Sequence, residues 1–194
     1  TETGFKDVVF ITAAYGLGEN VVQGAVDPDE LYVHKPTFEQ GYRAVLRRAL
    51  GGKKIKMIYG HGGTRNATRN VPTAAEERRR YCISDEEAMT LADYAIKVEK
   101  HYSEKAGYDK PMDMEWAKDG ITDELFIVQA RPETVQSQKD VTTFEDYKML
   151  EKGNVLITGQ SVGAKIGAGK VTVIKSSHEM ERFKKGEVLV TDMT

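Results

Sequence analysis

The chain has 194 residues, a formal net charge of −2 and charged side chains at 30% of its positions. This near-neutral balance gives no reason to expect nucleic acid or a membrane as a partner. The single cysteine, Cys82, excludes an internal disulfide framework and fits a reducing compartment, which predicts a cytoplasmic location. No apolar run approaches the roughly 20 residues that a membrane-spanning helix needs.

The first part of the chain alternates short apolar runs with turns. These runs predict strands at Val8–Ala14, Leu31–Lys35 and Lys54–Tyr59. Gly16 and Gly18 follow the first run, but Val21 stands where a dinucleotide-binding fingerprint has its third glycine, so that fingerprint is excluded. The two glycines favour a tight turn and leave open a close approach of backbone amides to a ligand. Residues 60–80 predict an exposed loop with a short helix near Ala74–Arg80.

The clearest helix begins after Ser84. Ser84 with Glu87 three residues later is a capping box, which favours a helix start at this point. Apolar side chains then recur at helical spacing, at Leu91, Ala95, Val98 and Tyr102. Gly107 predicts the end of the helix.

Two strand-like runs, Met112–Ala117 and Glu124–Arg131, flank a turn signal and predict a hairpin. Because alternate side chains of a strand share a face, Asp113 and Glu115 point away from Trp116. On the second run the same alternation predicts one shared face for Leu125, Ile127, Gln129 and Arg131. If odd residues pair with odd residues, opposite Cβ atoms lie about 4.5–5.5 Å apart. The side chains that then converge are Asp113, Glu115, Gln129 and Arg131.

This set of side chains has a chemistry of its own. Two carboxylates and an amide oxygen are hard ligands that suit Mg²⁺, and a guanidinium binds phosphate oxygens as a fork. The hairpin therefore predicts one wall of a nucleotide–magnesium site. The alternative is a solvated face with an ordinary arginine–carboxylate pair, and the spacing by itself leaves both open.

The composition becomes polar after Pro132 and predicts a linker at 136–146, followed by a second domain from residue 147. The second domain is predicted to contain strands at Asn154–Thr158, Gly169–Ile174 and Glu187–Val190, with a short helix at Ser177–Arg182. Gly163–Lys170 is not a phosphate-binding P-loop, because Ala164 and Val171 occupy positions that its pattern reserves for other residues. The chain has no initiator methionine and ends on an apolar run, so we expect it to be a piece of a longer protein.

Several long strings resemble the phosphoenolpyruvate synthases (pyruvate, water dikinases), which are phosphoenolpyruvate-utilising enzymes. They are Gly16–Thr37, Lys53–Tyr59, Pro111–Gly120 and Leu125–Thr134. The resemblance continues into Gly163–Ile174 and Gly186–Thr194. It implies an α+β (α/β) fold in which residues 1–135 are the C-terminal part of an ATP-grasp domain. Residues 147–194 would then begin a swivelling β/β/α phosphohistidine domain.

The resemblance also implies Mg²⁺ and ATP as cofactors. It carries over to Glu115 and Gln129 as metal or phosphate ligands, to Arg131 as a phosphate clamp and to Asp113 as a supporting ligand. These are the four residues that strand alternation identifies independently. The implied protein acts on ATP and pyruvate and has neither nucleic acid nor a membrane as a partner, and a homodimer is compatible with the resemblance.

The implied reaction converts ATP, pyruvate and water to phosphoenolpyruvate, AMP and phosphate through a phosphohistidine. That histidine is expected downstream of Thr194, so we expect no catalytic residue and no turnover in this chain alone. The same hairpin would serve a pyruvate phosphate dikinase or an antibiotic phosphotransferase. A non-catalytic nucleotide-binding module remains a further alternative.

Overall fold

The computed structural model describes residues 5–60, 68–133, 147–151, 153–159 and 165–191. The chain divides into two compact units, Thr1–Lys139 and Asp140–Thr194. The predicted linker at 136–146 lies outside the described residues, as do Gly163 and Ala164. Among the residues described, no helix combines the length and apolar character that crossing a membrane requires.

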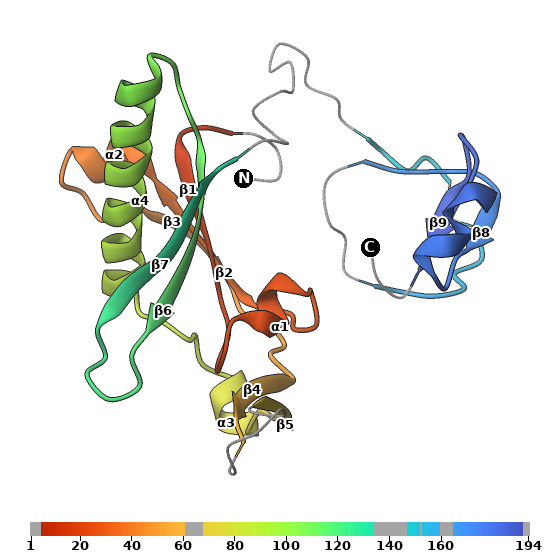
Figure 1. The fold of residues 1–194 in the computed structure, drawn as a ribbon, viewed down its shortest axis with the longest axis horizontal. Coiled ribbons are helices and arrows are strands. Elements are labelled where there is room, and N and C mark those ends of the chain that lie inside the picture. Colours follow the sequence, from red (N-terminus) through yellow and green to blue (C-terminus); the bar gives the residue numbers. More distant parts are fainter. Residues whose placement is uncertain (1–4, 61–67, 134–146, 152, 160–164, 192–194) are drawn as a thin grey trace. The chain divides into compact units, whose positions relative to one another are not determined.

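The first unit is a mixture of helices and small antiparallel sheets (Figure 1). Its elements are β1 (Val8–Ala13), α1 (Glu19–Val22), β2 (Asp29–His34), α2 (Lys35–Glu39), β3 (Val45–Ala49), β4 (Ile55–Tyr59), β5 (Thr68–Pro72), α3 (Ala75–Arg78), α4 (Asp85–Ala106), β6 (Met112–Lys118) and β7 (Leu125–Pro132). Strands β1, β2 and β3 form one sheet, while β4–β5 and β6–β7 are hairpins.

Helix α4 organises the core of this unit. Buried side chains of α4, among them Leu91 and Ala92, form one cluster with Ile11 and Leu31 of the three-stranded sheet. Trp116 of the β6–β7 hairpin packs against the same cluster. Consequently the sheet and the hairpin both turn an apolar face toward α4 and an opposite face away from it.

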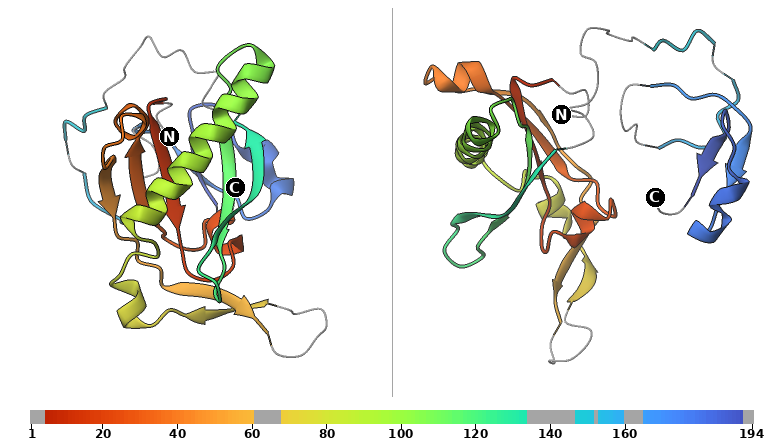
Figure 2. Two further views of the ribbon diagram at one scale, coloured as in Figure 1. Left: turned by 90° about the vertical axis from the view of Figure 1, so that its left-hand side faces the viewer. Right: turned by 45° about the horizontal axis from the view of Figure 1, so that its top comes forward.

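Strands β1 and β6 belong to separate sheets, and both sheets pack against α4 (Figures 1 and 2). An ion pair of 3.2 Å between Lys6 and Asp109 joins the segments that lead into these two strands.

The predicted helix after Ser84 is confirmed as α4. The Ser84 hydroxyl accepts a hydrogen bond from the backbone N–H of Glu87, and Gly107 ends the helix with a φ of +76°. The predicted apolar stripe is correct at Leu91 and Ala95, but Tyr102 is 39% exposed because the last turns of α4 extend beyond the strands (Figure 1). The buried face includes Ile96, which the predicted stripe omitted.

The strand predictions for the first unit need three corrections. The second strand begins earlier than predicted, at Asp29, and ends at His34, because Pro36 fits the first turn of α2. Strand β5 replaces part of the loop predicted for residues 60–80, because Thr68–Pro72 pairs antiparallel with β4. Strand β3 was not predicted, since two arginines interrupt its apolar pattern.

In the second unit, β8 (Val171–Val173) and β9 (Val188–Val190) pair in parallel, with the 3-10 helix η1 (Ser177–Arg182) between them in sequence. The predicted strand at Asn154–Thr158 is wrong. Its apolar side chains are exposed, with Leu156 at 95%, and it pairs with no strand in the described ranges. Apolar side chains without a partner strand do not hold an extended segment in a sheet.

Candidate functional site

The β6–β7 hairpin brings the four predicted side chains together. Its register places Asp113 opposite Arg131 and Glu115 opposite Gln129. Residues directly opposite in an antiparallel pair project from the same face of the sheet. All four are exposed. The predicted pairing is confirmed, whereas their roles as ligands stay predictions.

A β-bulge corrects the predicted faces of β7. Glu115 pairs with Gln129 but Trp116 pairs with Ile127, so Val128 has no partner on β6. Ile127 therefore faces the core with Trp116, while Val128, 61% exposed, and Gln129 both point outward. The prediction that Leu125 and Ile127 share a face with Gln129 and Arg131 is wrong, because a bulge breaks strict alternation. Bulges of this kind are frequent beside functional sites.

The electrostatics of this face leave its charged groups available to a ligand. The Arg131 Nε and Asp113 Oδ2 atoms are 3.9 Å apart, and the two side chains are 65% and 55% exposed. An exposed ion pair at this distance contributes at most about 1 kcal/mol. The Arg131 guanidinium can therefore turn to a phosphate at little energetic cost.

The donor set of the hairpin suits Mg²⁺ better than it suits a metal ion that is coordinated only by protein side chains. Within the described residues, no group of three or more His, Cys, Asp or Glu side chains is arranged to hold a metal ion. Asp113 and Glu115 supply two carboxylates, and Gln129 supplies an amide oxygen opposite Glu115. Mg²⁺ commonly binds through one or two carboxylates and completes its shell with water and substrate phosphates.

The turn end of the hairpin is fixed to the start of α4. Lys118 forms ion pairs with Glu87, at 2.7 Å, and with Asp123, at 3.0 Å. The hydrogen bonds to Glu87 and Asp123 raise the pKa of Lys118 above its ordinary value. On the inner face, Trp116, Leu125 and Ile127 pack against the core. The ion pairs of Lys118 and the packing of the inner face therefore both hold the hairpin, with its outer face, in position.

Comparison with known proteins identifies the family of this chain. Residues 1–152 match the family model described as "Pyruvate phosphate dikinase, AMP/ATP-binding domain". The chain belongs to this family. The matched region contains all four side chains of the hairpin face, so these residues lie in an AMP/ATP-binding domain.

Relatives of this AMP/ATP-binding domain carry a consistent name. The chain is 56% identical over 194 residues to a phosphoenolpyruvate synthase of Synechocystis, covering 100% of the chain and 24% of that protein. It is 53% identical over 200 residues to a phosphoenolpyruvate synthase of Helicobacter pylori, covering 100% of the chain and 25% of that protein. The chain thus spans about a quarter of the length of the curated relatives it matches.

The glycine turn of the AMP/ATP-binding domain has a structural explanation. Gly16 has a φ of +82°, and a Cβ at this position would lie 2.2 Å from the backbone oxygen of Met57 in β4. The adjacent Leu17 donates its backbone N–H to the same oxygen, at 2.9 Å. The glycine turn therefore allows the backbone at Gly16 to approach β4 closely. The structure offers no reason to assign Gly16 to a ligand.

Cys82 of the AMP/ATP-binding domain is expected to be a poor nucleophile. Burial, reinforced by the nearby Asp29 carboxylate, raises the pKa of its thiol to about 12. Because only the thiolate reacts, we expect alkylation by iodoacetamide at pH 8 to be roughly a thousandfold slower than that of free cysteine. Mass spectrometry of the labelled chain measures this rate, with the urea-unfolded chain as the fast control. Equal rates in the folded and unfolded chain would contradict the burial of this thiol.

Proposed function

We propose that this chain supplies the Mg²⁺–ATP-binding surface of a phosphoenolpyruvate synthase. The complete protein would convert ATP, pyruvate and water to phosphoenolpyruvate, AMP and phosphate. The observation that carries the proposal is the register of β6 and β7, which gathers Asp113, Glu115, Gln129 and Arg131 on one exposed face of an AMP/ATP-binding domain. The names of the relatives support phosphoenolpyruvate as the product, and the resemblance noted in the sequence implies the rest of the reaction.

Each side chain of the face has a task that its chemistry allows. Glu115 and Gln129 hold the metal ion, with Asp113 as a supporting ligand. Arg131, which is only weakly paired with Asp113, binds the phosphate oxygens as a fork. When bound, Mg²⁺ neutralises charge on the phosphates, and the rigid hairpin orients them.

The finer features of the fold belong to the same proposal. The first unit would be the C-terminal part of an ATP-grasp domain, with α4 behind its strands and the nucleotide in front of them. The second unit would begin a mobile phosphohistidine domain, with the parallel β8–β9 pair in its sheet. The complete protein would act in the cytoplasm and is compatible with a homodimer.

Replacement of Glu115 by glutamine tests the proposal in the intact protein. The change removes one negative charge and keeps the shape of the side chain. We expect Mg²⁺–ATP to bind about 10- to 100-fold more weakly, because a contact to a charged group contributes about 1.5–3 kcal/mol. Titration calorimetry with ATP at saturating magnesium measures the change.

Glu124→Gln is the matched control, since Glu124 belongs to the same hairpin but lies in its turn, where its carboxylate accepts a hydrogen bond from Thr122. We expect the control to bind Mg²⁺–ATP like the wild type. Equal affinity in wild type and Glu115→Gln would remove this face from the nucleotide site.

The runner-up function is the same site in a pyruvate phosphate dikinase, and the description of the matching family favours it. The relatives with the identities given above are named phosphoenolpyruvate synthases, which favours water over inorganic phosphate as the second acceptor. A non-catalytic nucleotide-binding module is the weakest alternative, because the complete set of ligand side chains is present.

A further inference from the structure

The two carboxylates of the hairpin face have different neighbours. Asp113 lies opposite Arg131, and the Arg131 Nε and Asp113 Oδ2 atoms are 3.9 Å apart. Glu115 lies opposite the uncharged Gln129 and forms no ion pair with any residue in the described part of the chain. The face therefore carries one carboxylate that has a counter-ion and one that has none.

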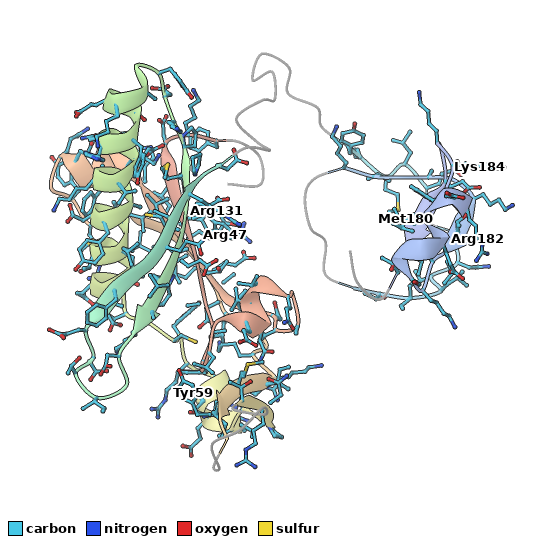
Figure 3. All side chains as sticks on the ribbon, viewed as in Figure 1. Arg47, Tyr59, Arg131, Met180, Arg182 and Lys184 are labelled. Carbon is cyan, nitrogen blue, oxygen red and sulfur yellow. The ribbon has the colours of Figure 1, made fainter. Side chains whose placement is uncertain are left out.

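The counter-ion of Asp113 is itself a group to which the proposed function gives a ligand. Arg131 lies on the side of the hairpin opposite α4 (Figure 3). A guanidinium beside a carboxylate attracts a second anion less strongly, and the carboxylate likewise attracts a second cation less strongly. As long as Asp113 and Arg131 are paired, each reduces the affinity of the other for a ligand.

The strength of this pair sets the size of the effect. The pair is longer and more exposed than the ion pair of Arg48 with Asp85, which measures 2.8 Å with the Asp85 side chain 14% exposed. An exposed ion pair changes an equilibrium by at most about fivefold. The pair is thus weak enough for a ligand to open and strong enough for its loss to be measured.

We propose that the Asp113–Arg131 pair couples the binding of phosphate to the binding of the metal ion. Arg131 leaves Asp113 for a phosphate group, and the Asp113 carboxylate then becomes available to the metal ion. This inference rests on the proposed function and adds a regulation of the same site. The ligand that opens the pair spares the second ligand the cost of opening it, so each strengthens the other by up to about fivefold.

Glu115 does not take part in this exchange. Because it has no counter-ion among the described residues, it can receive a cation whether the Asp113–Arg131 pair is open or closed. Asp113 is added to the metal site only after Arg131 has turned to a phosphate. The arrangement therefore favours the complex of metal and nucleotide over either component alone.

The experiment measures ATP binding without a metal ion. The variant is Asp113→Asn in the intact protein, because asparagine has no charge with which to hold Arg131. We expect ATP in excess EDTA to bind about three- to fivefold more tightly than to the wild type. At saturating magnesium we expect no gain, because the variant has also lost a supporting metal ligand. Equilibrium dialysis with labelled ATP measures both affinities.

Two controls separate the pair from a general effect of charge. Glu124→Gln removes a negative charge from the turn of the same hairpin, and we expect it to bind metal-free ATP like the wild type. The second control combines Asp113→Asn with Arg131→Gln and is compared with Arg131→Gln alone. Because the coupling acts through Arg131, Asp113→Asn is expected to give no gain in this background.

Two results would overturn the coupling. One is metal-free ATP that binds Asp113→Asn no more tightly than it binds the wild type. The other is an equal gain with and without Arg131, which would show a general effect of charge. Either result leaves the proposed function standing if Glu115→Gln weakens Mg²⁺–ATP, whereas full Mg²⁺–ATP affinity in Glu115→Gln would overturn both proposals.

Discussion

An alanine inserted between Glu115 and Trp116 is expected to abolish Mg²⁺–ATP binding, whereas deletion of Val128 is expected to preserve it. The bulge gives β7 one residue more than β6 between the Trp116–Ile127 and Glu115–Gln129 pairs. Deletion of Val128 leaves Ile127 next to Gln129, which is ordinary alternation with one side chain inward and the next outward. Every other side chain of the hairpin then keeps its face.

The insertion has the opposite effect because it supplies a partner for Val128. Once every residue of β7 has a partner on β6, side chains must alternate strictly along both strands. One half of β6 then exchanges its inward and outward faces, since a one-residue slip exchanges the two faces of a strand. Because Trp116 packs against the core, we expect it to keep its face and Asp113 and Glu115 to turn toward apolar side chains. This change removes at least two charged contacts, so we expect affinity to fall more than about 100-fold.

Calorimetry with Mg²⁺–ATP on both variants of the intact protein measures these outcomes. Emission from Trp116, the only tryptophan of the chain, shows in the isolated chain which half of β6 has turned over. Full nucleotide affinity in the insertion variant, together with Trp116 emission like that of the wild type, would contradict the role of the bulge. So would a deletion variant that binds as poorly as the insertion variant.

Replacement of Lys53 by methionine is expected to reduce the free energy of unfolding by about 3–5 kcal/mol. The side chains of Lys53 and Asp29 are both fully buried and form an ion pair. The Asp29 carboxylate also accepts hydrogen bonds of 2.8 Å from the backbone N–H groups of Gly51 and Cys82. This group joins the start of β2, the turn before β4 and the segment before α4. Loss of the lysine charge leaves a buried carboxylate without its counter-ion.

Urea unfolding of the chain, followed by Trp116 emission, measures this change. Lys97→Met is the matched control, because Lys97 pairs with Asp93 within an exposed turn of α4 and contributes only about 0.3–0.5 kcal/mol. A further variant combines Lys53→Met with Asp29→Asn and is expected to be more stable than Lys53→Met alone. A loss below about 1 kcal/mol for Lys53→Met would contradict the importance of the buried pair.

Local patterns in the sequence were sufficient to predict α4 and the hairpin. The capping box at Ser84 acts within one helical turn, and the β6–β7 pairing follows from a short turn between two alternating runs. The predicted convergence of Asp113 with Arg131 and of Glu115 with Gln129 therefore holds in the structure. The ligand roles of these residues are still predictions.

Features that depend on distant residues were missed. Strand β3 forms because it pairs with β2. Neither segment by its own sequence predicts that Arg47 of β3 lies opposite Tyr32 of β2. The strand predicted at Asn154–Thr158 failed for the converse reason, since an apolar run needs a partner strand. The bulge at Val128 also lacks a local signal, because core packing of Ile127 decides which side chain turns inward.

The sequence by itself determined that Asp113, Glu115, Gln129 and Arg131 converge on one face of a hairpin, because strand alternation and short turns are local properties. Only the tertiary structure decided that the hairpin and the three-stranded sheet pack on the same helix and that Lys53 meets Asp29. Those relations require the segment 5–60 to pack with α4 and the hairpin, and side-chain packing across such sequence distances is not written in any short pattern.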